Sequence, residues 1–164
     1  MLITTKVDIN NLGVQPKDYN EKLKLTRFNN YIHLFHKRYI HIILDKKELK
    51  WMKEAFKIGN ITGKFPNSYL DELNNFLNKY NYVNEYLKLY NNKVFCRTSI
   101  HSLKSGKYSN LKNIIISMVT FRHTHNPINK NLYILPWIEL DYDLEFRVFV
   151  YKNKITAISQ QHFS

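Results

Sequence analysis

The sequence predicts an α+β fold, and three observations carry this prediction. Residues 144–151 alternate at the two-residue period of a β-strand. Residues 49–56 place apolar side chains on one side of a helix. Further β-rich and helical runs, joined by polar loops, lie between these segments. An order of strand, helix, strand, helix and strands that ends in a hairpin is typical of an α+β lobe.

A strand followed by a capped helix is the first segment with defined ends. Residues 39–44 are rich in Ile and predict a strand. Asp45, with Glu48 three residues later, has the pattern of a capping box, in which the two side chains satisfy backbone N–H groups at a helix start. We therefore expect a helix that ends at Ile58 and is stopped by Gly59 in a left-handed conformation.

A second helix is expected after the break at residues 63–66. Ser68 is a suitable N-cap, and Asp71 follows at the third position. The helix has an apolar stripe whose members are Leu70, Leu73, Phe76, Leu77 and Tyr80. Such a stripe is typical of a core-facing surface rather than of a cofactor site.

The middle of the chain continues the alternation of elements. We expect a strand at residues 93–98, a polar loop at 99–109, a helix at 111–121 and a loop at 122–131. Upstream of all these elements, residues 1–38 give weak signals, with a polar stretch followed by a helical pattern.

Three strands are predicted near the C-terminus. They lie at residues 132–139, 144–151 and 154–160, and we expect them to form one antiparallel sheet because the last two are joined by a short polar turn. We divide the chain accordingly into residues 1–131, an N-terminal region with a first lobe, and residues 132–164, a hinge and the start of a second lobe.

Composition limits the classes of function. The chain has a formal net charge of +12, 44% hydrophobic residues and no apolar run long enough for a membrane helix. Its single cysteine, Cys96, excludes an internal disulfide and fits a reducing compartment, so we expect a cytoplasmic protein without a membrane partner. Abundant Lys, Asn, Ile and Tyr with two alanines are the bias of an AT-rich genome, and this bias explains the charge more simply than a nucleic-acid surface does.

Short motifs in the second half resemble those of a known family. The motifs are Val94-Phe95-Cys96-Arg97 with Ser102, Trp137, Glu145-Phe146-Arg147 with Phe149-Val150, and Ile158-Ser159-Gln160. In type and spacing this series resembles the cell division cycle protein 123 family over about the last seventy residues. The resemblance implies an ATP-grasp-like fold of two lobes with antiparallel sheet. It also implies ATP and magnesium as ligands, and a role as assembly chaperone of eukaryotic translation initiation factor 2.

The resemblance also implies a set of ATP-binding residues. Arg97 is expected to meet phosphate, and the segment from Leu135 to Ile138 to meet adenine through its backbone. The full set is Arg97, Ser102, Lys104, Leu135, Trp137, Ile138, Asp143, Glu145, Arg147 and Gln160. The residues alone leave a simpler reading open, in which Arg97 pairs with a nearby carboxylate and Arg147 pairs with Glu145 on the surface.

The sequence departs from the family pattern in ways that bear on the metal. The family has Lys where this chain has Arg97, and Arg where it has Gln161. The family's magnesium-holding motif is expected beyond Ser164, so the chain is expected to be a fragment or a natural truncation, and no metal ligand is assigned within it. His123 and His125 are two ligands at most, which falls short of a zinc site.

Two other classes of function stay open at this point. One is an ATP-grasp ligase that joins a carboxylate to an amine, although no catalytic residue is identifiable. The other is a basic nucleic-acid-binding module, since clustered Lys and Arg attract phosphate backbones.

Overall fold

The structure is a computed structural model that describes residues 21, 24–35, 38–103, 106–120, 126–139, 141, 145–151 and 153–160. Helices and strands are interspersed along the chain, and the strands form two antiparallel sheets. This arrangement confirms the α+β class. The elements are η2 (Phe28–Asn30), α2 (Ile32–Phe35), β1 (Ile40–Ile43), α3 (Lys46–Thr62), η3 (Asn67–Tyr69), α4 (Leu70–Lys79), α5 (Tyr82–Leu89), β2 (Val94–Thr98), α6 (Leu111–Thr120), β3 (Asn131–Pro136), β4 (Phe146–Tyr151) and β5 (Lys154–Gln160).

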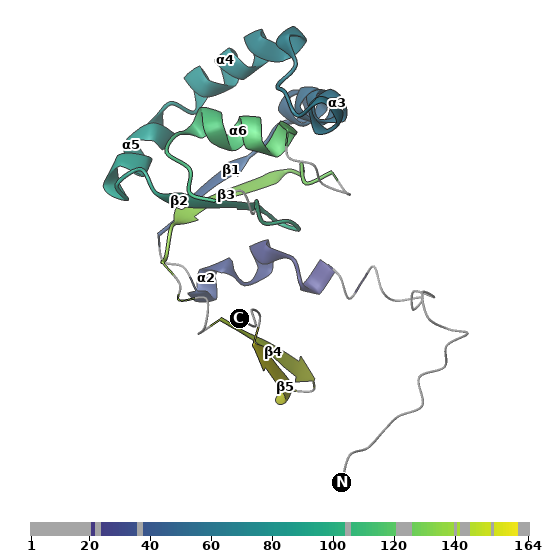
Figure 1. Cartoon of the computed structure of the whole chain (residues 1–164), viewed down its shortest axis with the longest axis vertical. Coiled ribbons are helices and arrows are strands. Elements are labelled where there is room, and N and C mark those ends of the chain that lie inside the picture. The colour runs from purple at the N-terminus through teal and green to yellow at the C-terminus, as the bar shows by residue number, and fades with distance from the viewer. Residues whose placement is uncertain are drawn as a thin grey trace, which may run out of the picture.

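The larger sheet has three strands in the order β1-β3-β2, all antiparallel. Helices α3, α4, α5 and α6 lie on one side of it, and the segment with α2 lies on the other (Figure 1). Strand β3 is central, and its residues from Leu132 to Leu135 are all buried. An unbroken buried run of this kind fits a strand that is covered on both faces.

The prediction of one sheet for the three C-terminal strands is wrong. Strand β3 pairs with β1 and β2, whereas β4 and β5 form a separate two-stranded sheet. The period-2 pattern identifies a strand but carries no information about its partner, and proximity in sequence favoured the wrong one. The predicted division of the chain after residue 131 remains a prediction.

Helix α3 begins as expected but ends later than expected. Asp45 Oδ1 accepts a hydrogen bond from Glu48 N, and Glu48 Oε2 accepts one from Asp45 N, each at 2.8 Å, so the capping box is confirmed. The predicted stop at Gly59 is wrong, because the helix continues to Thr62 and Gly63 takes the left-handed conformation with φ 69°. Gly59 instead faces α6 at close range.

The second helix is confirmed, but its cap is not. Ser68 lies within η3, and α4 starts at Leu70 without a side-chain cap. Leu73 and Phe76 of the predicted stripe are buried. Helix α5 was not predicted, although Val83 and Leu87, four residues apart and both buried, give it a weak helical signal.

The sheet divides the interior into two apolar clusters. The larger cluster fills the space between the sheet and helices α3–α6, and Val94, Cys96 and Ile134 enter it from the strands. The smaller cluster lies on the other face, where Phe28 and Ile32 of the η2–α2 segment pack on Tyr133 and Leu135. Within the described ranges, no helix is long and apolar enough to cross a bilayer.

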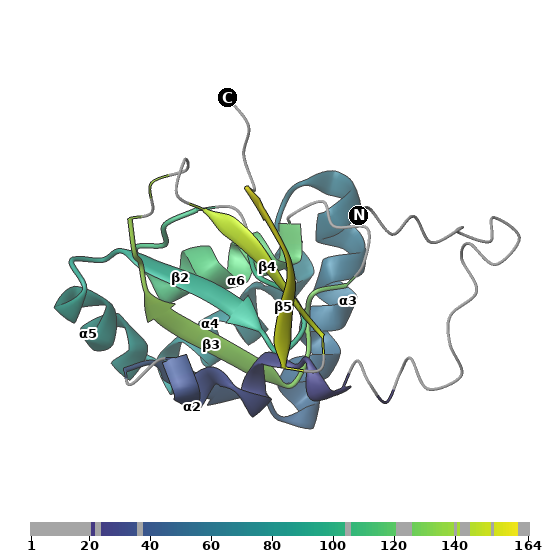
Figure 2. The ribbon, with the colours of Figure 1, turned by 90° about the horizontal axis from the view of Figure 1, so that it is seen from below.

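The predicted hairpin is confirmed by β4 and β5. Arg147 pairs with Ser159 and Val148 with Ile158, and Asn153 takes a positive φ of 60° in the turn. The hairpin lies on the same side of the three-stranded sheet as α2 (Figures 1 and 2). The hairpin carries large apolar side chains that are 50–63% exposed in the described part of the chain: Phe146, Val148, Phe149, Val150, Ile155 and Ile158.

Candidate functional site

Strand β2 places Arg97 on the sheet face that the large helices leave free. Residues Val94, Cys96 and Thr98 of this strand are buried, and Phe95 and Arg97 alternate with them. Successive side chains of a strand point to opposite faces, so Arg97 shares its face with the smaller apolar cluster. Its neighbour Cys96 lies in the main core, where burial raises the pKa of the thiol.

Aromatic side chains and one carbonyl group surround the Arg97 guanidinium. Its Cζ atom lies 3.8 Å from the centroid of the Phe28 ring, and its Nε donates a hydrogen bond to Thr98 O at 3.3 Å. Burial lowers the pKa of Arg97, partly offset by a hydrogen bond to the Tyr31 side chain. An arginine stays charged under these conditions. The site is therefore a partly buried, fixed positive charge.

No carboxylate neutralises this charge in the described part of the chain. The ion pairs found there join Lys79 to Asp45 and Glu48, Lys88 to Glu85, and Lys107 to Glu139. The simpler reading, in which Arg97 pairs with a nearby carboxylate, is thus not supported by the described residues. Because a cation removed from water is costly without a counter-ion, Arg97 is a suitable place for an anionic ligand.

The loop after β2 brings Ser102 beside Arg97. The two residues form an isolated antiparallel β-bridge, and Leu103 N donates to Cys96 O at 3.0 Å. Thr98 N donates to His101 O at 2.7 Å, which closes the turn. The predicted residue Lys104 lies outside the described residues, so its position relative to Arg97 remains a prediction.

Leu135 and Trp137 lie along the same face. Leu135 belongs to the smaller cluster with Tyr133, and the Trp137 ring centroid is 6.4 Å from that of Phe95. Trp137 N donates to Lys93 O at 3.1 Å, which holds the segment after β3 against β2. Ile138, next along the chain, is largely exposed. The adenine-binding role of this segment remains a prediction.

Lys107 lies over the same tryptophan. Its Nζ is 5.4 Å from the centroid of the Trp137 ring, and it forms an ion pair with Glu139. The Lys107 ammonium group holds the pKa of the Glu139 carboxyl below its usual value. A lysine engaged in this way has one fewer donor for a ligand.

The remaining predicted residues belong to the hairpin region. Arg147 is exposed on β4, and Gln160 pairs with Phe146 at the end of β5. Glu145 precedes β4 and is partly buried. Asp143 lies outside the described residues. The expectation that Arg97 and Arg147 belong to one ATP-binding site remains a prediction.

Sequence reasoning missed the two aromatic residues that contact Arg97. Phe28 and Tyr31 lie in the region 1–38, for which we predicted little. Phe28, Tyr31 and Tyr39 lie within a stretch of twelve positions. This density of aromatic residues was the available signal for a packed segment.

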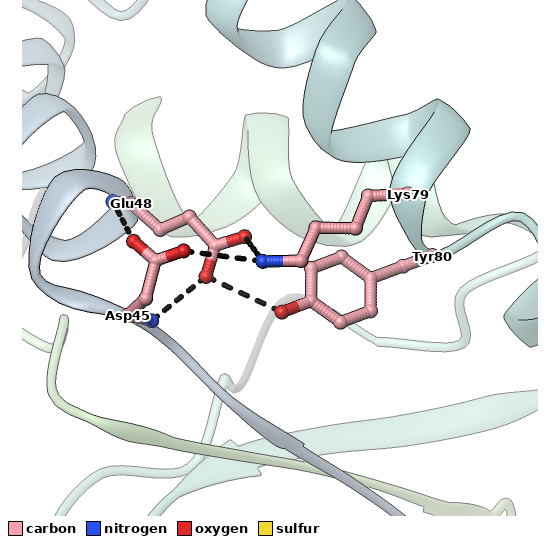
Figure 3. A network of polar contacts seen from close by, with 4 residues as sticks. All are labelled: Asp45, Glu48, Lys79 and Tyr80. Carbon is pink, nitrogen blue, oxygen red and sulfur yellow. Dashed lines mark hydrogen bonds and ion pairs between the residues drawn. The ribbon is translucent and has the colours of Figure 1, made fainter.

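A second polar cluster joins α3 to α4. Lys79 Nζ contacts Glu48 Oε1 at 2.7 Å and Asp45 Oδ2 at 3.1 Å, and the Tyr80 hydroxyl donates to Glu48 Oε2 at 3.3 Å (Figure 3). A cavity of about 180 Å³ adjoins it, with Trp51 and Phe76 in its wall. The charged and polar groups of this cluster are hydrogen-bonded to one another, so the cluster serves as a structural link between α3 and α4. Nowhere in the described ranges do three or more His, Cys, Asp or Glu residues gather as metal ligands.

Taken together, the described structure defines an α+β protein with a candidate anion site on its sheet. Comparison with known proteins gives the family: the model of the D123 family, the cell division cycle 123 family, matches residues 71–164. Because the match covers more than half of the chain, the protein belongs to this family. No curated protein and no solved structure matches the chain. The family match includes Arg97 and the hairpin but begins after Phe28 and Tyr31.

Proposed function

We propose that this protein is an ATP-grasp-type, ATP-binding protein that assists the assembly of eukaryotic translation initiation factor 2. Membership of the cell division cycle 123 family supports the proposal. The observation that carries the ligand part is Arg97, a partly buried cation without an ion-pair partner in the described chain. We infer a cytoplasmic, non-enzymatic role, in which nucleotide is a bound ligand.

In this proposal the triphosphate lies against Arg97 and the loop with Ser102. A guanidinium binds phosphate oxygens in a bidentate manner, which gives both strength and orientation. The backbone from Leu135 to Ile138 binds the adenine ring. Lys104, Asp143, Glu145, Arg147 and Gln160 complete the site.

Magnesium needs hard oxygen ligands, usually carboxylates. Among the proposed site residues that the structure describes, Glu145 is the one carboxylate. The described residues therefore do not form a magnesium site by themselves. We assign the metal to no residue of this chain.

Calorimetric titration with ATP tests the ligand part. Arg97→Gln keeps a polar side chain of similar length but removes the charge, so we expect ATP affinity to fall about tenfold or more, the effect of a charged hydrogen bond. Arg38→Gln is the matched control, because Arg38 is exposed and outside the site. Equal affinity of wild type and Arg97→Gln would refute the role of Arg97.

A binding assay with the isolated subunits of translation initiation factor 2 tests the partner part. We expect one subunit to be retained by the immobilised chain in physiological salt. Retention of none of the subunits, with or without ATP, would refute the chaperone role and leave the nucleotide site to be judged by calorimetry alone.

A lysine row on α3 favours nucleic-acid binding as a second candidate function. Lys46, Lys50, Lys53 and Lys57 recur every three or four residues, are exposed, and form no ion pair in the described chain. They lie on one helix face over about 16 Å. A salt titration of single-stranded RNA binding tests this candidate. A slope near zero would exclude it, whereas a slope that falls by about one unit for each lysine replaced would support it.

A further inference from the structure

The segment from Arg27 to Tyr31 is fixed on the sheet face that carries Arg97. Phe28 N donates to Ser99 O at 3.0 Å, and the buried Phe28 ring packs edge-on against Tyr133 with centroids 5.2 Å apart. Tyr31 N donates to Phe28 O at 3.2 Å, and the two rings lie 5.4 Å apart. A buried ring with a backbone anchor forms a rigid support.

The Arg97 Cζ atom lies over the Phe28 ring at 3.8 Å from its centroid, a distance that fits a guanidinium lying face-on to the ring. A guanidinium carries five N–H donors around its edge, and stacking on an aromatic ring occupies none of them. Nε donates to Thr98 O, and a second donor is taken by the Tyr31 side chain. Stacking fixes the plane of the group while most of its edge stays available for a second ligand. The arrangement therefore orients the Arg97 guanidinium and leaves donors for a ligand, rather than burying the group completely.

We propose that Phe28 and Tyr31 are positioning residues, which hold the Arg97 guanidinium in the orientation that binds a phosphate group. The N-terminal segment thereby becomes part of the ligand site, although it lies outside the family match. The inference rests on the proposed function where it takes ATP as the ligand. It is independent of that function where it states only that a positioned guanidinium binds a polyphosphate. Orientation that is fixed in advance raises affinity because less side-chain freedom is lost on binding.

Binding of two probes, ATP and inorganic triphosphate, to variants of the full chain tests the proposal. Phe28→Leu removes the ring face but keeps an apolar side chain, and we expect both affinities to fall roughly three- to tenfold, the size of a cation–π contact. Phe28→Tyr keeps the ring and is expected to retain affinity. Phe76→Leu is the matched control, since Phe76 is equally buried but lies in the main core.

A second readout reports on Arg97 directly. In ¹⁵N NMR spectra the Nε–H signal of a fixed arginine exchanges slowly with water, so we expect Phe28→Leu to broaden or lose this signal and Phe76→Leu to keep it. Tyr31→Phe removes one hydroxyl and is expected to act in the same direction with a smaller loss of affinity. This variant keeps the test usable if Phe28→Leu does not fold.

The outcomes separate the inference from the proposed function. Wild-type ATP binding that depends on Arg97 but is unchanged in Phe28→Leu and Tyr31→Phe overturns the inference and leaves the function standing. Binding of inorganic triphosphate that depends on Phe28, without ATP binding, supports the inference and overturns the function. If neither ATP nor inorganic triphosphate binds to the wild type, both the inference and the proposed function are overturned.

Discussion

At the scale of single residues, Gly59 shows how the absence of a side chain lets two helices pack closely. A Cβ atom at Gly59 would lie 2.7 Å from both Cγ1 and the carbonyl oxygen of Val119 on α6. The backbone atom cannot move without shifting its helix. Glycine is thus required by packing, whereas its neighbour Gly63 is favoured by its positive φ.

We predict that Gly59→Ala destabilises the protein. Alanine gains up to about 1 kcal/mol in helix propensity, but overpacking costs about 1–3 kcal/mol, so a net loss is expected. Chemical denaturation measures the free energy of unfolding. Ile61→Ala, at an exposed position two residues on, is the control and should change it little. A more stable Gly59→Ala variant would show that α6 can move away.

The residues around Arg97 also show where sequence reasoning ends. The strand motif identified Arg97 as a candidate, since the type and order of neighbouring residues suffice for that. Its contact with Phe28 joins residues far apart in the chain and arises only when η2 packs on the sheet. No local pattern encodes such a contact, and the weak helical pattern within residues 1–38 gave no reason to expect it.

At the scale of elements, the polar cluster at the start of α3 connects two helices. Lys79, the last residue of α4, reaches both carboxylates of the capping box. The hydrogen bond from Glu48 N is the largest cause that holds the pKa of Asp45 below its ordinary value, and the contact with Lys79 is the second. The capping box was predictable from four residues of sequence, but its link to α4 was not.

We predict that this link makes stability depend on pH. Since the pKa of Asp45 is lower in the folded state, its contribution to stability is fully present above the unfolded pKa near 4 and is lost as pH falls from there through the lower, folded pKa. The urea midpoint should therefore fall as the pH is lowered from about 5 into this acid range. In Asp45→Asn the fall should be smaller, and Asp71→Asn, on an exposed position of α4, is the control. Identical pH profiles for wild type and Asp45→Asn would contradict the prediction.

Elements with strong local patterns were predicted and elements defined by partners were not. The capped start of α3, strand β2 and the hairpin follow from spacing and turn residues. Helix α5 is short, with two buried residues, and it is stabilised by packing rather than by its own pattern. The pairing of β3 with β1 and β2 depends on contacts between distant residues, which no period reveals.

We predict that the β4–β5 hairpin binds apolar probes. Val148 and Ile158 form a cross-strand pair, and both are at least half exposed. Replacing both with Thr keeps β-branched side chains but lowers apolar area, so the fluorescence of an added hydrophobic dye should fall. Leu89→Thr, at an exposed position outside the hairpin, should change it less. Equal dye binding by wild type and the double variant would place the apolar surface elsewhere.

At the scale of the whole molecule, charge and family membership support different functions. The net charge of +12 acts at long range on any polyanion, whereas Arg97 is one fixed group on one sheet face. Long-range attraction is screened by salt over a Debye length of about 8 Å at physiological strength, while a partly buried contact is screened less. The salt dependence of ligand affinity therefore distinguishes long-range electrostatic attraction from binding at a specific site around Arg97.

We predict that residues 1–164 bind ATP weakly and without dependence on magnesium. The proposed phosphate contacts in the described chain come from cations, and Glu145 alone among the described site residues offers a carboxylate. Calorimetry with and without magnesium should give similar affinities, and binding should weaken as salt rises above about 0.15 M. The Arg97→Gln variant should lose the part of the affinity that persists at high salt.

Tight, magnesium-dependent and salt-resistant ATP binding would contradict this prediction. It would mean that residues of this chain hold the metal, since magnesium requires oxygen ligands close to the phosphates. Asp141, Asp143 and Glu145 would then be the first carboxylates to replace, each by its amide, because they precede the hairpin in the sequence range that the family match includes. Loss of the magnesium effect in one of these variants, with ATP still bound in a salt-dependent manner, would identify that carboxylate as the ligand.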